Sequence, residues 1–132
     1  MNSHRKILGV DFGTKRIGLA VSYGHLAEPL LILTHDERAF DRLKQICKQE
    51  QITEVVVGLS ENKTAERTQV FVAQLVKNLE LPVAVFDETL STQSARNKLK
   101  NPSTKKSKQH LPLDHYAAAE ILQEYLDTQV GQ

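Results

Sequence analysis

Four acidic side chains stand at the ends of predicted strands or helices: Asp11, Asp87, Glu88 and Asp114. Asp is depleted in strands, and burying a bare carboxylate is costly. A carboxylate that ends an apolar strand must therefore be paired, neutralised or bound to a metal. The alternative for Asp11 is an Asp that caps the following turn through its own backbone. The alternative for Asp114 is a favourable interaction with the dipole of a helix that begins after Pro112.

Carboxylates that converge on one point repel each other unless a cation lies between them. Hard divalent ions such as Mg²⁺ or Mn²⁺ prefer oxygen ligands. Two such ions ~4 Å apart can clamp the attacking and leaving oxygens of a phosphodiester. Adjacent strand residues point to opposite faces, so Asp87 and Glu88 are not expected to reach one metal by the same route.

Basic residues lie close to these acids in the sequence. The corner that follows Asp11 contains Thr14, Lys15 and Arg16, which are candidates for contact with a phosphate or, more simply, solvated turn residues. A polar segment before Asp114 contains five lysines that could bind the nucleic-acid backbone or form a solvated loop. These lysines are Lys98, Lys100, Lys105, Lys106 and Lys108.

The apolar periodicity predicts how the acids are positioned. Short β-rich runs predict strands at 7–11, 17–21, 29–33, 52–59 and 82–86, and helical spacing predicts helices at about 38–50, 66–79 and 113–127, with another after Ser91. Strand–helix–strand crossovers require parallel pairing. The sequence therefore predicts an α/β fold, in which a mixed five-stranded sheet has three antiparallel strands followed by parallel strands, and helices cover both faces.

Two local predictions concern the first two helices. Thr34 and Glu37 have the spacing of a capping box for the first helix. In the second helix an apolar face is expected from Val70, Ala73 and Val76, widened by Phe71, Leu75 and Leu79.

The composition limits the class of protein. The 132 residues suffice for one domain, expected to span residues 1–132, and the net charge of +1 argues against a generally basic surface. Cys47 is the only cysteine, which excludes a disulfide within the chain, and its apolar neighbours favour a buried hydrophobe. Because no apolar run is long enough for a signal peptide or a membrane span, we expect a cytoplasmic protein without a membrane partner.

Four stretches resemble motifs of the YqgF family, also called RuvX. They are Gly9-Val-Asp-Phe-Gly-Thr-Lys-Arg-Ile-Gly-Leu-Ala20, Val56-Val-Gly-Leu59, Asp87-Glu-Thr-Leu-Ser-Thr92, and the segment from Asp114 to Asp127. The resemblance implies an RNase H-like fold related to the RuvC resolvases. It also implies a nuclease that helps to process the 5′ end of pre-16S ribosomal RNA, with a further link to Holliday-junction resolution.

The resemblance also implies a catalytic, metal-binding set, which falls on Asp11, on Glu88 or the additional candidate Asp87, and on Asp114. Glu88 is favoured because its longer side chain can reach a metal from beyond the strand end. The chain departs from the family pattern at Thr89, where the family has Arg and so a rigid, charged phosphate fork. It also has Ser60 where the family usually has Pro.

The leading hypothesis is a metal-dependent endonuclease that acts on structured RNA as a monomer or weak dimer. The alternatives are a resolvase of four-way DNA junctions, which would act as a dimer, and a binding module without catalysis on the same scaffold. The stretch from Asp11 to Thr14 is also similar to the phosphate motif of actin- and Hsp70-like ATPases. Those proteins close two such domains around ATP, whereas this chain offers one.

Overall fold

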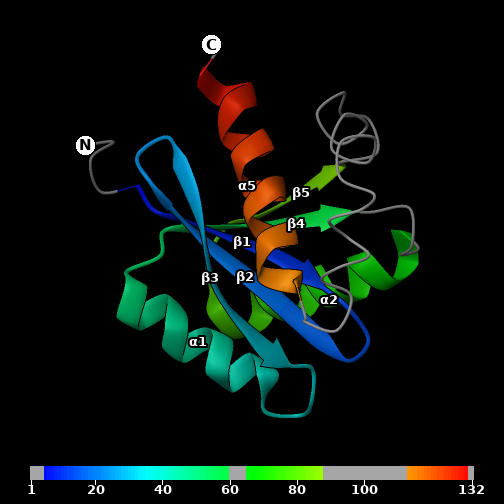
Figure 1. Ribbon diagram of the computed structural model, residues 1–132. Helices are drawn as coiled ribbons and strands as arrows, with labels where there is room; N and C mark the ends of the chain where they lie inside the picture. Colours follow the sequence, from blue (N-terminus) through cyan, green and yellow to red (C-terminus); the bar gives the residue numbers. More distant parts are fainter. Residues whose placement is uncertain (1–4, 60–64, 88–112, 131–132) are drawn as a thin grey trace.

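The computed structural model describes residues 5–59, 65–87 and 113–130. These residues form one five-stranded sheet with the strand order β3-β2-β1-β4-β5 (Figure 1). The strands are β1 (Ile7–Phe12), β2 (Arg16–Tyr23), β3 (Leu26–Thr34), β4 (Glu54–Leu59) and β5 (Val83–Asp87). The described helices are α1 (Ala39–Glu50), α2 (Ala65–Leu79) and α5 (Asp114–Val130). None of these three helices is long and apolar enough to cross a membrane.

The pairing of the strands confirms the predicted mixed sheet. β1 and β2 are antiparallel, as are β2 and β3, whereas β1 pairs in parallel with β4 and β4 in parallel with β5. The third strand begins at Leu26, earlier than the predicted start at Pro29. Pro29 fits within this strand because β3 lies at the edge of the sheet and its register with β2 shifts next to the proline.

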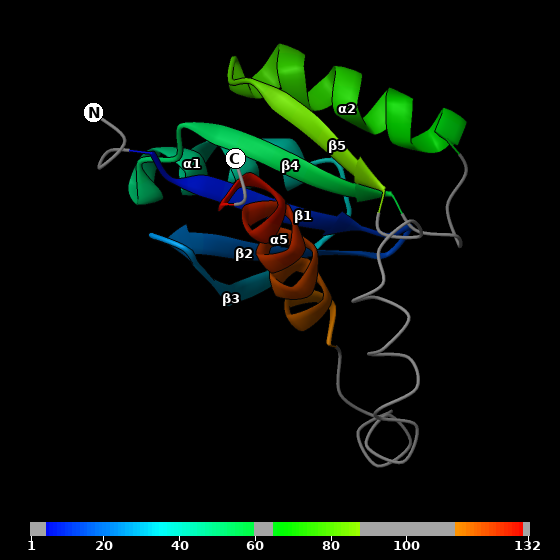
Figure 2. The same cartoon turned by 90° about the horizontal axis from the view of Figure 1, so that it is seen from above.

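The helices cover the two faces of the sheet unequally. α5 lies alone across one face, and α1 and α2 lie on the other (Figure 2). Alternate residues of β1 follow this division: Leu8, Val10 and Phe12 join the core beneath α1 and α2, and Ile7 joins the core beneath α5. By the same alternation Asp11 belongs to the face that α5 covers.

The predicted capping box of α1 is wrong. The N-cap is Arg38, and it makes no side-chain capping bond. Thr34 is still part of β3, where it pairs with Arg16, so it lies too far before the helix to cap it. The carboxylate of Asp36 instead accepts a hydrogen bond from the Arg38 amide at 2.9 Å and closes the turn.

The predicted apolar face of α2 is only partly correct. Phe71, Leu75 and Leu79 are buried, but Val70 is 60% exposed and Val76 is 48% exposed. The ring of Phe71 stacks on that of Phe12, with centroids 4.4 Å apart and planes 11° apart. Burial of these large rings sets the rotation of the helix, and the smaller valines are left outside.

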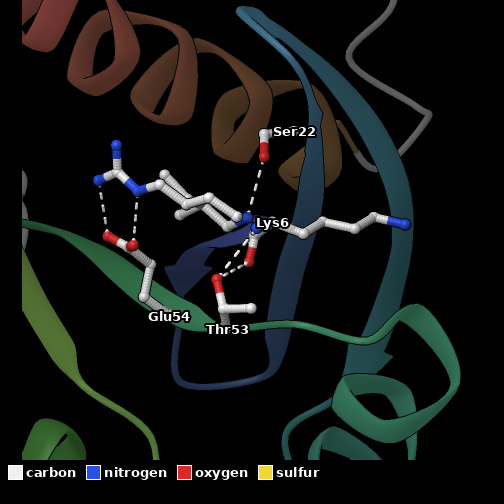
Figure 3. Close-up of polar contacts among 6 residues, drawn as sticks. Lys6, Ser22, Thr53 and Glu54 are labelled. Carbon is white, nitrogen blue, oxygen red and sulfur yellow. Dashed lines mark hydrogen bonds and ion pairs between the residues drawn. The ribbon is translucent and has the colours of Figure 1, made fainter. Parts of the chain in front are cut away.

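Polar contacts at the start of β1 and β4 fix the parallel register (Figure 3). The Lys6 amide donates to Thr53 Oγ1 at 3.0 Å, and the Thr53 amide donates to the Lys6 carbonyl at 2.8 Å. Arg5 forms a bidentate pair with Glu54, at 2.7 and 2.9 Å, and the Ile7 amide donates to Ser22 Oγ of β2. With their starts aligned, β1 and β4 also end at the same edge of the sheet.

α5 approaches the sheet very closely at three glycines, one each on β1, β2 and β4. A Cβ atom on Gly18 would lie 1.9 Å from the carbonyl oxygen of Asp114, and one on Gly58 would lie 2.3 Å from Ile121 Cδ1. A Cβ atom on Gly9 would lie 2.8 Å from Leu122 Cβ. Because these glycines have no side chains, α5 can pack close against the sheet. Gly18 also determines the position of the first turn of α5.

Gly18→Ala is expected to destabilise the fold by at least about 2 kcal/mol, because the obstructing atoms belong to the backbone and α5 itself must move. Urea unfolding followed by circular dichroism measures this loss. Gly24→Asn is the matched control, since a Cβ atom there meets nothing within 4 Å and Asn tolerates the positive φ of 64°. Equal unfolding midpoints for the two variants would contradict the close-approach argument.

Cys47 is buried in α1, as predicted, and burial raises the pKa of its thiol to about 11. The thiol therefore keeps its proton at pH 8, and the reactive thiolate is scarce. We expect the folded protein to resist a disulfide reagent at pH 8 and to react fully once unfolded in urea. Rapid labelling of the native protein would show that the site opens without unfolding.

Candidate active site

The turn between β1 and β2 forms the first wall of the site. The Gly13 amide donates to the Arg16 carbonyl at 2.8 Å, which closes the turn. His35, just after β3, makes two hydrogen bonds to the backbone of this turn. Its amide donates to the Lys15 carbonyl at 2.9 Å, and its Nδ1 is hydrogen-bonded to the Gly13 carbonyl. Thr14, Lys15 and Arg16 are all exposed. The backbone of the turn is thus fixed, and its polar side chains face solvent.

Asp11 and Asp114 meet at this turn. Asp11 pairs in register with Gly18 of β2, and Gly18 lies directly beneath the Asp114 carbonyl. Both aspartates line a pocket of about 240 Å³, together with the turn from Gly13 to Arg16. The side chains come from the end of the first strand and the first residue of the last helix, so only the packing of α5 brings them together.

A direct ion pair links the turn to the helix. Nε of Arg16 donates to Oδ2 of Asp114 at 2.7 Å, with the two side chains 49% and 27% exposed. An ion pair this accessible is worth at most about 1 kcal/mol. It orients the carboxylate but leaves it able to bind another cation. Sequence reasoning gave Arg16 as a phosphate contact or a solvated turn residue and missed this ion pair, because no sequence signal connects residues so far apart in the chain.

Asp87 does not line the pocket that contains Asp11 and Asp114. It ends β5, which β4 separates from β1. Phe86 packs in the core beneath α5, so Asp87, the next residue along the strand, belongs to the opposite face. Glu88 and the five lysines of the segment before Asp114 lie outside the described residues, as do Ser60 and Thr89.

The chemistry of the donor set suits a hard cation. In residues 5–59, 65–87 and 113–130 no group of three or more His, Cys, Asp or Glu side chains could hold a metal ion. Asp11 and Asp114 provide a pair of carboxylates on one pocket, and Mg²⁺ is commonly held by one or two carboxylates while it keeps several waters. The two aspartates fit such an ion as part of its ligand set.

Comparison with solved structures supports the fold. The chain is similar to Thermus thermophilus RuvC in complex with a Holliday junction substrate, with a TM-score of 0.59, 15% identity and 97% of each chain covered. It is also similar to the fowlpox virus Holliday junction resolvase, with a TM-score of 0.56, 14% identity, and 94% of this chain and 99% of that chain covered. At such low identity these similarities establish the RNase H-like fold alone.

Sequence comparison goes further. A relative from Malacoplasma penetrans is 35% identical over 95% of this chain and 96% of its own length, and one from Geobacillus thermodenitrificans is 36% identical over 93% and 98%. Both carry the name "Putative pre-16S rRNA nuclease". The family model described as RuvX, Holliday junction resolvase, matches residues 5–128. The chain therefore belongs to the RuvX family, as its motifs predicted.

Proposed function

We propose that this protein is a nuclease that cleaves phosphodiester bonds in structured RNA, and that its substrate is the 5′ end of pre-16S ribosomal RNA. The observation that carries the proposal is the pocket in which Asp11 and Asp114 adjoin the cationic turn. The names of the relatives support the choice of RNA. On this proposal residues 1–132 act as one domain in the cytoplasm, as a monomer or weak dimer.

In this proposal Asp11 and Asp114 hold Mg²⁺ or Mn²⁺, and Glu88 is the third ligand. Glu88 is chosen over Asp87 because Asp87 belongs to the face of the sheet away from Asp11. A bound divalent ion supplies Lewis acidity, which polarises the phosphodiester and neutralises the charge that develops in the transition state.

The residues of the turn position the RNA backbone. Lys15 supplies an exposed positive charge beside the carboxylates, and the Thr14 hydroxyl can donate to a phosphate oxygen. Arg16 has five N–H donors, of which Nε–H is directed to Asp114. Its remaining donors can hold a phosphate, so one guanidinium both orients a metal ligand and binds substrate. The five lysines before Asp114 are proposed to extend this contact along the strand.

A second candidate substrate is a four-way DNA junction. The family description and the two resolvases of similar fold favour it. Two-fold symmetric cleavage of a junction requires two active sites, so this activity predicts a dimer on the junction. The two substrates are separated by assaying a pre-16S fragment and a junction under the same conditions.

Asp11→Asn and Asp114→Asn are each expected to slow Mg²⁺-dependent cleavage of a 5′-extended pre-16S fragment on the order of 10²-fold or more, since each removes a charge that the reaction needs. Gel analysis of the labelled fragment measures the rates. Asp41→Asn, an exposed change of the same type on α1, is the control and should cleave like the parent. If Asp11→Asn cleaves the fragment as fast as the parent, Asp11 is not a catalytic residue.

Arg16→Gln is expected to change metal binding and cleavage in opposite directions. Loss of the guanidinium frees the Asp114 carboxylate, so Mn²⁺ should bind up to about fivefold more tightly, the equivalent of an exposed ion pair. Cleavage should nevertheless slow, because the phosphate loses its donor. Calorimetric titration with Mn²⁺ and the cleavage assay measure the two effects. Weaker Mn²⁺ binding together with slower cleavage would mean that Arg16 chiefly maintains the pocket.

A further inference from the structure

A second and larger cavity lies on the other side of the β1–β2 turn. Its volume is about 610 Å³, within the range of small-molecule sites in proteins. The turn, His35 and the first half of α2 form its walls. It contains neither Asp11 nor Asp114, so it is distinct from the pocket of the candidate active site.

The inner wall of this cavity is aromatic. Phe12 and Phe71, which stack on each other, both line it, and the ring of His35 meets Phe71 edge to face at 5.8 Å. Val70 adds an aliphatic side chain that is 60% exposed. Phe12 and Phe71 are only 6% and 3% exposed and form the floor of the cavity, so Val70 and the half-buried His35 ring are the apolar surfaces that a ligand can contact more freely. These surfaces favour a flat, partly apolar ligand.

The rim of the cavity is polar and comes from α2. Glu66 provides acceptors, Arg67 provides donors, and the amide of Gln74 provides both. Such side chains can pair with the edges of an unstacked base, and RNA is commonly recognised through unpaired bases held in this way. An aromatic wall with a mixed donor and acceptor rim matches a nucleobase better than a lipid or a simple phosphate.

The two cavities share one wall. Phe12, Gly13 and Thr14 line both, and three residues of extended chain span only about 10 Å. A strand that places a phosphate beside Asp11 and Asp114 can therefore extend a neighbouring base across the turn. The rigidity of the turn, which His35 hydrogen-bonds at two points, keeps the two cavities at a fixed separation.

We propose that the cavity lined by Phe12, His35, Val70, Phe71 and Gln74, called here the base pocket, binds an unpaired nucleobase adjacent to the phosphate held at Asp11 and Asp114. The inference deepens the proposed nuclease function and rests on it. It assigns to the base pocket the selection of an unpaired nucleotide next to the cleavage position, so that a continuous duplex is a poor substrate.

The test compares two matched variants of α2. Val70→Trp fills the base pocket, whereas Val76→Trp changes the same residue type on the same helix at a position that does not line it. Both valines are exposed, so neither change disturbs the core. Gln74→Ala is a second pocket variant that adds no bulk. Binding of a short single-stranded RNA is measured by fluorescence anisotropy in the Asp11→Asn background, which is intended not to cut it.

Contact of one base with the His35 ring and Val70 predicts that Val70→Trp weakens RNA binding about tenfold, that Gln74→Ala weakens it less, and that Val76→Trp binds like the parent. An abasic nucleotide is then placed at each position of the RNA in turn. At one position it should lower the affinity of the parent about tenfold, whereas the affinity of Val70→Trp should be the same with and without the abasic nucleotide. Equal abasic losses in Val70→Trp and Val76→Trp would overturn the base pocket.

Cleavage by the protein with native Asp11 separates failure of this inference from failure of the proposed function. If RNA is cut but Val70→Trp and Val76→Trp respond equally to the abasic scan, the nuclease stands and the base pocket is wrong. If no RNA is cut but the abasic loss at one nucleotide occurs in the parent and in Val76→Trp and is absent in Val70→Trp, the base pocket stands as a binding site and the nuclease proposal is wrong.

Discussion

The close approach of α5 to the sheet is the constraint on which the candidate site depends. Gly9, Gly18 and Gly58 remove side chains from three strands beneath the helix, and one carbonyl and two apolar side chains of the helix occupy the space they leave. At Gly18 the contact is with the carbonyl of Asp114 itself. The glycines therefore determine where the last helix begins, and so where its acidic first residue lies relative to Asp11.

The β1–β2 turn organises the functional surface around this packing. One side of the turn faces a carboxylate pocket, and the other faces the larger cavity that we propose as the base pocket. Arg16 connects the turn to α5, and His35 connects it to the end of β3. The positive charges of the turn lie beside the two aspartates here. This arrangement suits a negatively charged phosphate together with the divalent ion proposed above. The same arrangement would serve RNA or a DNA junction, since both present the same phosphodiester.

Membership of the RuvX family and the RNase H-like fold agree with this geometry. The fold similarity to RuvC and to the fowlpox resolvase spans nearly the whole chain, but it does not select a substrate. What distinguishes the proposed RNA nuclease from a scaffold without catalysis is whether the paired aspartates take up a divalent ion. The ion pair between Arg16 and Asp114 affects this uptake, because the guanidinium competes with a divalent ion for one of the two carboxylates.

The sequence by itself determined the order of the described strands and helices and their parallel or antiparallel pairing. These follow from local periodicity and from the geometry of crossovers, which act over short stretches of chain. The family follows from the resemblance of the motifs, and the helix predicted after Ser91 lies outside the described residues. The sequence also singled out Asp11 and Asp114. Only the tertiary structure decided which face of α2 is buried, that Thr34 belongs to β3 and not to a helix cap, and that Arg16 reaches Asp114. Those features depend on contacts between segments far apart in the chain, where ring stacking and backbone proximity override local preference.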